Sequence, residues 1–226
     1  MNKSTPDSPH CNHSAIRVAP WVGDQYGQAT GVFRQRTLIL GGSQYSPGYE
    51  SFHTDEGLAE WRSFTNDVVY YYLDPKISGR WKGTYTRFIN SVFGSQTDEE
   101  QRRGFFDSVI FYNYLQEIAG ASASDAGNFD YHAPCHFDAF REIIETYRPE
   151  VVIAWGSKVW DALPNDWGHG EAEIRDGVTV GAVISQKIFH YPFRDTVIRL
   201  VGVRHPSIGY SPDFHHQIFK QLDLLA

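Results

Sequence analysis

A histidine followed by proline and serine stands directly after an apolar run near the C-terminus. The segment is RHPSIGYS, residues 204–211. Pro206 fixes its own φ, so this loop can hold His205 in one place, while Ser207 and Ser211 can donate hydrogen bonds to phosphate oxygens. The segment therefore suits the binding of an anion or a departing group. A surface turn with an incidental histidine is the alternative interpretation.

A second candidate loop follows an apolar run in the first quarter of the chain. In TLILGGSQYS, residues 37–46, aliphatic side chains give way to paired glycines, then to Ser43, Gln44 and the aromatic Tyr45. A buried parallel strand commonly opens into a binding loop in this way. The segment predicts a central strand over Leu38–Leu40 with a ligand-facing loop after it.

Two more apolar runs carry polar groups. In VIFYNYLQ, residues 109–116, Asn113 offers an acceptor and two donors side by side, enough to read the edge of a pyrimidine. The run VVIAWGSK, residues 151–158, ends in a Trp-Gly-Ser turn, in which Ser157 is a suitable N-cap for a helix over 158–163.

The segments between these loops predict the elements that position them. Apolar residues recur at helical intervals in 52–72, 81–92, 137–147 and 214–225, with strand-like runs among them. Strands alternating with helices predict a three-layer α/β/α fold with a central, mostly parallel sheet. The carboxyl ends of such strands meet at one edge, where ligands bind, so the four loops should converge there. A sheet edge that is polar only because loops are polar is the alternative.

The domain organisation follows from composition along the chain. Residues 1–15 are polar, rich in Pro and Ser and aperiodic, which predicts a flexible tail. Residues 16–226 should form a single domain, because no linker divides them. The potential metal ligands His10, Cys11 and His13 lie in that tail without a fourth ligand nearby, so no metal site is expected.

The formal net charge of −7 argues against a protein that coats nucleic acid, since phosphate neutralisation by Lys and Arg drives such binding. A local basic strip is still compatible with this charge. Its candidates are Lys76, Arg80, Lys82, Arg87, Lys158 and Arg204.

The two cysteines, Cys11 and Cys135, are too few for a disulfide framework, which favours a reducing, cytoplasmic location. They are also too few for an iron–sulfur cluster, which requires four thiolates. No apolar run approaches the length of a membrane span, and the first residues lack the apolar core that is typical of a secretory signal. We expect a cytoplasmic monomer with no membrane contact and no metal or organic cofactor.

In chain order, the four loops resemble the motifs of the uracil-DNA glycosylase superfamily, and the resemblance covers residues 20–226. A water-positioning loop comes first, here Gly41 to Tyr45. A strand with a base-reading amide follows, here Asn113, and then a strand that ends in Trp-Gly-Ser, here 155–157. The His-Pro-Ser loop, here 205–207, comes last. The resemblance implies an enzyme that flips a nucleotide out of DNA and cleaves its N-glycosidic bond.

The resemblance also implies roles for single residues. His205 would donate a hydrogen bond to the oxyanion of the leaving base, and Asn113 would read the base edge. Tyr45 and Gly42 would border the ring, and Tyr210 would fill the space that the flipped base leaves, unless it is an ordinary exposed loop residue. Contacts to the DNA backbone would come from Ser157, Lys158, Ser207 and Ser211.

The first loop departs from the family pattern. A typical uracil-DNA glycosylase has an aspartate that orients the attacking water, and Ser43 or Gln44 falls at that position here. Some branches of the superfamily carry a neutral amide there and remain active, so we expect Gln44 to position the water. Glu50, a few residues later, is a further candidate carboxylate for this loop, and an exposed loop glutamate is the alternative.

The sequence therefore predicts a monofunctional DNA glycosylase that leaves an abasic site. Gly41 and Gly42 lack bulk beside the expected pocket, which favours a base larger than uracil. The expected substrate is DNA containing uracil or a bulky 5-modified cytosine such as glucosylated hydroxymethylcytosine, a modification found in phage genomes, which suggests phage defence. The alternatives are a weak or inactive module that binds modified DNA and a nucleoside or nucleotide hydrolase.

Overall fold

The structure is a computed structural model that describes residues 15–28, 31–122, 129–175, 178–180, 183–184, 188–207 and 209–226. The described strands are β1 (Trp21–Val22), β2 (Thr37–Gly41), β3 (Ile110–Asn113), β4 (Val151–Trp155), β5 (Glu173–Arg175), β6 (Thr179–Val180), β7 (Val183–Ile184), β8 (Ile188–Phe193) and β9 (Thr196–Val203). The described helices are η1 (Tyr49–His53), α1 (Asp55–Trp61), α2 (Phe64–Leu73), α3 (Lys82–Phe93), α4 (Glu99–Ser108), α5 (Pro134–Tyr147), α6 (Ser157–Ala162) and α7 (Pro212–Gln221).

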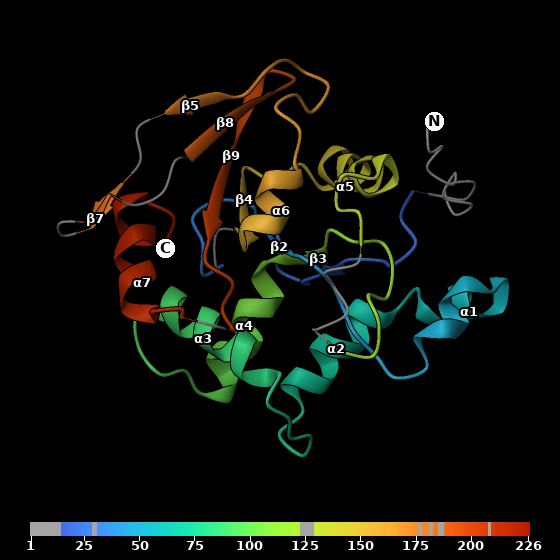
Figure 1. Cartoon of the computed structure of the whole chain (residues 1–226). Coiled ribbons are helices and arrows are strands. Elements are labelled where there is room, and N and C mark those ends of the chain that lie inside the picture. Colours follow the sequence, from blue (N-terminus) through green and yellow to red (C-terminus); the bar gives the residue numbers. More distant parts are fainter. Residues whose placement is uncertain are drawn as a thin grey trace.

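Seven strands form one mixed sheet in the order β1-β3-β2-β4-β9-β8-β5 (Figure 1). The central strands β3, β2, β4 and β9 are parallel to one another, which confirms the predicted α/β class and its mostly parallel centre. The outer strands β1, β8 and β5 are antiparallel to their neighbours, and the sequence analysis did not predict this. Only Arg194 and Asp195 separate β8 from β9, and a connection that short can join only antiparallel strands.

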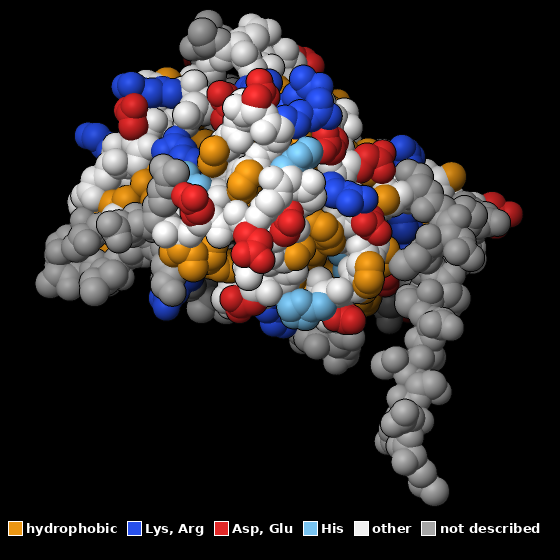
Figure 2. Space-filling view, turned by 90° about the horizontal axis from the view of Figure 1, so that it is seen from above, with side chains coloured by type: hydrophobic (Ala, Val, Ile, Leu, Met, Phe, Trp, Pro, Cys, Tyr) orange, Lys and Arg blue, Asp and Glu red, His pale blue; other side chains and the backbone are white. Residues whose placement is uncertain are grey.

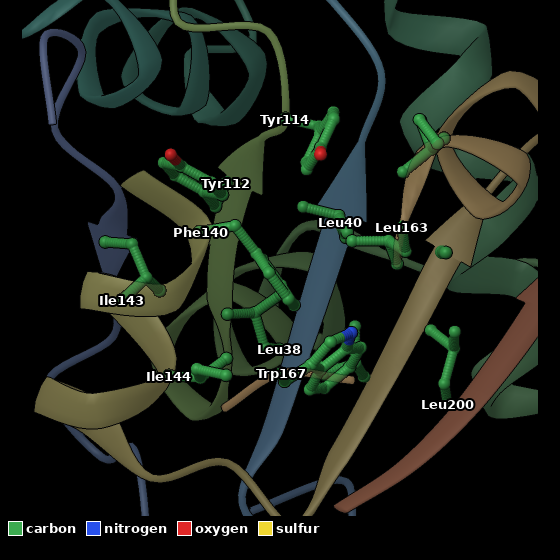
Figure 3. Packing of buried hydrophobic residues seen from close by; sticks show 14 of the residues in the cluster. Leu38, Leu40, Tyr112, Tyr114, Phe140, Ile143, Ile144, Leu163, Trp167 and Leu200 are labelled. Atoms are coloured by element: carbon green, nitrogen blue, oxygen red, sulfur yellow. The ribbon is translucent and has the colours of Figure 1, made fainter. Parts of the chain in front are cut away.

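Alternate side chains of the central strands pack on opposite faces of the sheet, so both faces are covered. Leu38 and Leu40 belong to a buried cluster with Phe140 of α5 and Val159 of α6 (Figure 3). Ile39, between them, belongs to a second cluster, which contains residues of α2, α3, α4 and α7. Helices α5 and α6 lie on one side of the sheet, and α2, α3, α4 and α7 lie on the opposite side, as Figure 1 shows. This arrangement is compatible with a three-layer α/β/α fold.

Local signals in the sequence end or begin several elements. Helix α3 ends at Gly94, whose φ of 70° favours glycine. Helix α4 begins with a capping box in which Asp98 and Gln101 bond each other's backbone N–H. Two local predictions were wrong: residues 52–72 form separate helices that break at 62–63, and Gly156, not Ser157, is the N-cap of α6.

Near the start of the described chain, the backbone N–H groups of Arg17 and Val18 donate to Gln116 Oε1 at 2.9 and 3.1 Å, which ties this segment to the domain. The predicted tail lies outside the described residues except for Ala15. None of the described helices combines the length and the apolar character that crossing a membrane requires.

Candidate functional site

Four neighbouring parallel strands end at the same edge of the sheet, and each leads into one of the candidate loops. Gly41 ends β2, Asn113 ends β3, Trp155 ends β4, and His205 stands two residues after the end of β9. With strands about 4.8 Å apart, the ends of β3 and β9 are about 14 Å from each other.

The loops after β2 and β3 run side by side beyond the ends of their strands. The N–H of Tyr114 donates to the carbonyl of Gly41 at 2.9 Å, and the N–H of Ala119 donates to the carbonyl of Gln44 at 2.8 Å. These bonds continue the parallel pairing of the two strands. They bring Gln44 to the end of β3, next to Asn113.

Three neutral side chains form a buried hydrogen-bond network at this point. Thr65 of α2 donates to Gln44 Oε1 at 3.2 Å, and Asn113 Nδ2 donates to the same oxygen at 3.3 Å. Gln44 is 5% exposed and Asn113 7%, and Gln44 Nε2 is buried with no hydrogen-bond partner. The network therefore has one unused donor.

Glu50, the further candidate carboxylate, is exposed in η1, as its alternative interpretation predicted.

The paired glycines admit neighbouring side chains instead of opening a pocket. A Cβ at Gly41 would collide with Asn113 Oδ1. At Gly42, a Cβ would come within 3.2 Å of Val159 Cγ2 and 3.3 Å of the Tyr131 hydroxyl. The inference that these glycines leave space for a bulky base was therefore wrong, because side chains already occupy that space.

Ser43 is engaged with two tyrosines. Its hydroxyl lies 2.6 Å from the hydroxyl of Tyr45, and it also forms a hydrogen bond with Tyr131. Burial raises the pKa of Tyr131, while the bond to Ser43 acts against this rise. Tyr45 is half-buried and packs against the cluster beneath the loop, so its ring can still border a ligand.

The contacts of His205 fix its tautomer. Ser207 donates its backbone N–H to His205 Nδ1 at 3.3 Å, and its hydroxyl lies 2.7 Å from the same nitrogen. An N–H group can only donate, so Nδ1 is the acceptor and the neutral ring carries its proton on Nε2. The predicted phosphate contact of the Ser207 hydroxyl does not fit this arrangement, because Nδ1 takes its single proton.

The loop that carries His205 is held from two sides. Arg87 of α3 donates to the backbone carbonyls of Pro206 and Ser207 at 3.1 and 3.0 Å. The imidazole packs edge-on against Trp155, with 6.3 Å between the ring centroids. Although His205 as a residue is partly exposed, burial of the ring lowers its pKa below the ordinary value of 6.5. The imidazole is neutral at pH 7.

Tyr210 lies in the interior, which corrects its predicted role. It is 9% exposed, its hydroxyl lies 2.7 Å from the Ser91 hydroxyl, and its ring stacks on His215 with 4.0 Å between centroids. A side chain held between α3 and α7 in this way cannot enter a DNA duplex. The ordinary-tyrosine alternative also missed its position, because that alternative placed the ring at the surface.

The remaining DNA-contact candidates are exposed. Ser157 and Lys158 open the short helix α6, and Ser211 is the N-cap of α7, where its hydroxyl accepts the N–H of Phe214 at 3.4 Å. A role in binding DNA stays a prediction for these three residues.

Some cations of the predicted basic strip form hydrogen bonds within the protein. Lys82 Nζ donates to the carbonyl of Asp74 at 2.7 Å, and Arg204 donates to the carbonyl of Gly209 at 3.0 Å. On the face that Figure 2 shows, basic and acidic side chains are interspersed. No continuous basic strip crosses this face.

A hollow of about 140 Å³ lies at the opposite edge of the sheet, lined by Arg36, residues 148–150 and residues 193–196. Two of its cations form ion pairs, Arg36 with Glu150 at 3.5 Å and Arg194 with Glu145 at 2.6 Å. It lies at the amino ends of β2, β4 and β9, away from the four loops. Within the described ranges, no group of three His, Cys, Asp or Glu side chains is arranged to hold a metal.

The structure thus joins Gln44 with Asn113, Ser43 with Tyr45, and His205 with Ser207, and it separates Tyr210 from all of them. Sequence reasoning missed Thr65 and Tyr131, for which no local signal exists. It named Arg87 only as a possible DNA contact. No protein-family model and no curated protein matches the chain.

Proposed function

We propose that the protein is a DNA glycosylase that removes a non-canonical or modified pyrimidine and leaves an abasic site. The observation that carries the proposal is the Gln44–Asn113 amide pair, which has one buried, unused donor at the sheet edge where His205 also stands. The four loops that resemble glycosylase motifs all begin at this edge.

The unused donor of Gln44 favours a ligand with an acceptor. Leaving a buried N–H unpaired costs about 1–3 kcal/mol, and a carbonyl oxygen of a pyrimidine would remove this cost. Gln44 Oε1 already accepts two hydrogen bonds, from Thr65 and Asn113. The amide oxygen therefore has little remaining capacity to accept a hydrogen bond from water, so we assign Gln44 to reading the base.

His205 can stabilise the negative charge that develops on the leaving base. When the bond from the sugar C1′ to the base nitrogen breaks, the base leaves with the electron pair and negative charge develops on its oxygen. The Nε2–H of the neutral imidazole can donate to that oxygen, and a donor placed in this way commonly contributes about 10²–10³-fold to a rate. Water then adds to C1′, and its proton passes to the departing base or to solvent.

The neutral character of the network favours a largely dissociative reaction. Gln44, Asn113 and Thr65 carry no ionisable group, so none of them can act as a strong general base. Stabilisation of the leaving base then accounts for most of the catalysis.

The same observation favours a second candidate, a module that binds modified DNA without releasing the base. Both functions need the amide pair, but only the enzyme needs the Nε2–H of His205. A His205→Ala variant separates them, because it should abolish base release and leave binding nearly unchanged.

The experiment uses duplex and single-stranded oligonucleotides that contain uracil, hypoxanthine, 5-hydroxymethylcytosine or its glucosylated form. The protein is incubated with each, and alkali then cleaves any abasic site. We expect cleavage of at least one pyrimidine substrate by the wild type and by Ile174→Ala, a change at an exposed position of β5, and none by His205→Ala. If a control glycosylase acts on the panel and this protein releases no base, the enzymatic proposal is wrong, and tight binding without release supports the module.

A further inference from the structure

Three aromatic rings are exposed around the turn that joins α2 to α3. Tyr70 is 60% exposed, Tyr71 52% and Trp81 39%. Clustered exposed aromatic rings commonly mark a binding surface. We define the α2–α3 surface by these rings and the adjacent cations, namely Tyr70, Tyr71, Lys76, Arg80, Trp81 and Lys82.

The cations of the α2–α3 surface belong to a positively charged segment of an acidic chain. Between Pro75 and Thr97 the sequence has four Lys and Arg residues and no Asp or Glu, although the whole chain has a net charge of −7. Lys76 and Arg80 are exposed. This positive charge favours a polyanion as the binding partner over a protein surface on which acidic and basic residues are mixed.

The turn holds the Trp81 ring in place. A Cβ at Gly79 would come within 2.7 Å of Trp81 Cδ1, so only glycine leaves room for the indole against the backbone. Lys82 Nζ lies 5.9 Å from the centre of this ring while it donates to the carbonyl of Asp74. A ring held by its surroundings loses little entropy when it binds a partner.

A chain of ring contacts joins this surface to the candidate site. Trp81 contacts Tyr85 with 5.9 Å between centroids, Tyr85 contacts Trp155 with 5.8 Å, and Trp155 contacts His205 with 6.3 Å. Arg87, one and a half turns further along α3, bonds the loop that carries His205. The surface is therefore connected through packed rings to the sheet edge where the four parallel strands end.

We propose that the α2–α3 surface binds an unpaired polynucleotide strand next to the target nucleotide. Bases would stack on Trp81 and Tyr71, and Lys76 and Arg80 would contact phosphates, the combination by which proteins hold single strands without reading their sequence. The assignment of this strand as the substrate's flank rests on the proposed glycosylase function. The preference for unpaired DNA rests on the exposed rings, because paired bases offer no free faces.

The test measures binding alone, by fluorescence anisotropy with a labelled, unmodified single-stranded oligonucleotide and with its duplex. We expect the single strand to bind more tightly, and Trp81→Ala to weaken its binding about tenfold. Arg80→Gln should reduce the slope of log affinity against log salt concentration by about 0.7, the value for one phosphate contact on a single strand.

Matched controls remove equally exposed groups elsewhere. Ile174→Ala takes a side chain that is 58% exposed from β5, and Arg141→Gln takes a cation from α5, on the other side of the sheet. Neither should change strand binding. Circular dichroism of each variant checks that the fold is retained.

The result that overturns the inference is single-strand binding that Trp81→Ala leaves unchanged, or no binding by the wild type. A wild-type dimer that Trp81→Ala converts to monomer in sedimentation would also overturn it, since the surface would then join two copies of this chain. Because this oligonucleotide contains no base to be excised, the binding test does not depend on catalysis. Strand binding here, combined with no base release from the modified oligonucleotides, contradicts only the proposed function.

Discussion

The Ser207 hydroxyl and His205 Nδ1 lie 2.7 Å apart, and the backbone N–H of Ser207 approaches the same nitrogen at 3.3 Å. The hydroxyl and the backbone N–H of Ser207 thus together select the tautomer of the His205 ring. The side chain that sequence reasoning assigned to phosphate binding instead orients the imidazole. A donating Nε2–H is the consequence.

Ser207→Ala should lower the rate of base release about fivefold, because one hydrogen bond of ~1 kcal/mol is lost while the backbone N–H still selects the tautomer. Ser207→Thr should restore the rate. Single-turnover measurements at saturating protein isolate this effect from binding. If the variant weakens DNA binding and leaves the saturated rate unchanged, Ser207 contacts phosphate and does not position the ring.

Gln44→Glu should reduce base release about 100-fold, since it replaces the unused donor with an oxygen that cannot pair with a base carbonyl. Thr65→Val is the matched variant, because it removes one donor to Gln44 Oε1 and keeps Nε2. It should cost about fivefold in the same assay. A rate that rises in Gln44→Glu would show instead that this position activates water, as the family pattern suggests.

The sequence predicted the elements that place the candidate site but not the contacts within it. Apolar runs and their polar ends are local, so they located Gly41, Asn113 and His205 at strand ends correctly. The antiparallel pairing of β8 with β9 depends on a two-residue connection at 194–195, which a search for alternating strands and helices overlooks.

The features that the sequence did not predict depend on contacts between residues far apart in the chain. Ser91 and Tyr210 are 119 residues apart and Gln44 and Asn113 are 69 apart, and no local pattern pairs them. The hydroxyl of Tyr210 therefore could not be assigned to the core from its loop-like sequence. In the same way, the sequence does not show that Asn113 approaches Gly41, because this contact exists only in the folded sheet. The space beside Gly41 was therefore predicted to be open.

The stability of the protein should fall in mild acid. Burial lowers the pKa of His136, His205 and His215 below 6.5 in the folded state. As pH falls below 6.5, the unfolded chain binds protons that the folded chain does not, so the free energy of unfolding decreases with decreasing pH. It should be nearly constant from pH 8 to 7 with respect to these groups.

Urea unfolding at pH 8, 7, 6 and 5 measures this dependence. His136→Gln removes a buried titrating group and should flatten the curve between pH 6 and 5, whereas His132→Gln, at an exposed position, should not. A free energy of unfolding that increases as the pH drops from 7 to 5 would contradict the burial of these rings as neutral groups.

Gly41→Ala should disable the amide pair without unfolding the protein. The added Cβ meets Asn113 Oδ1, so the carboxamide must turn away from Gln44, and base release should fall by at least tenfold. Gly104→Ala in α4 is the control, because a Cβ there meets nothing within 4 Å. This control should raise stability by about 0.5–1 kcal/mol and keep the wild-type rate.

A double-mutant cycle with Asn113→Ala tests whether this collision causes the effect. Asn113→Ala removes the oxygen that the new methyl would meet, so adding Gly41→Ala to it should change stability by less than about 0.5 kcal/mol. Thermal unfolding of the four proteins gives the coupling. If Gly41→Ala destabilises the chain equally with and without Asn113, the collision is with the backbone or Phe111 and the close approach of Asn113 is not what the glycine serves.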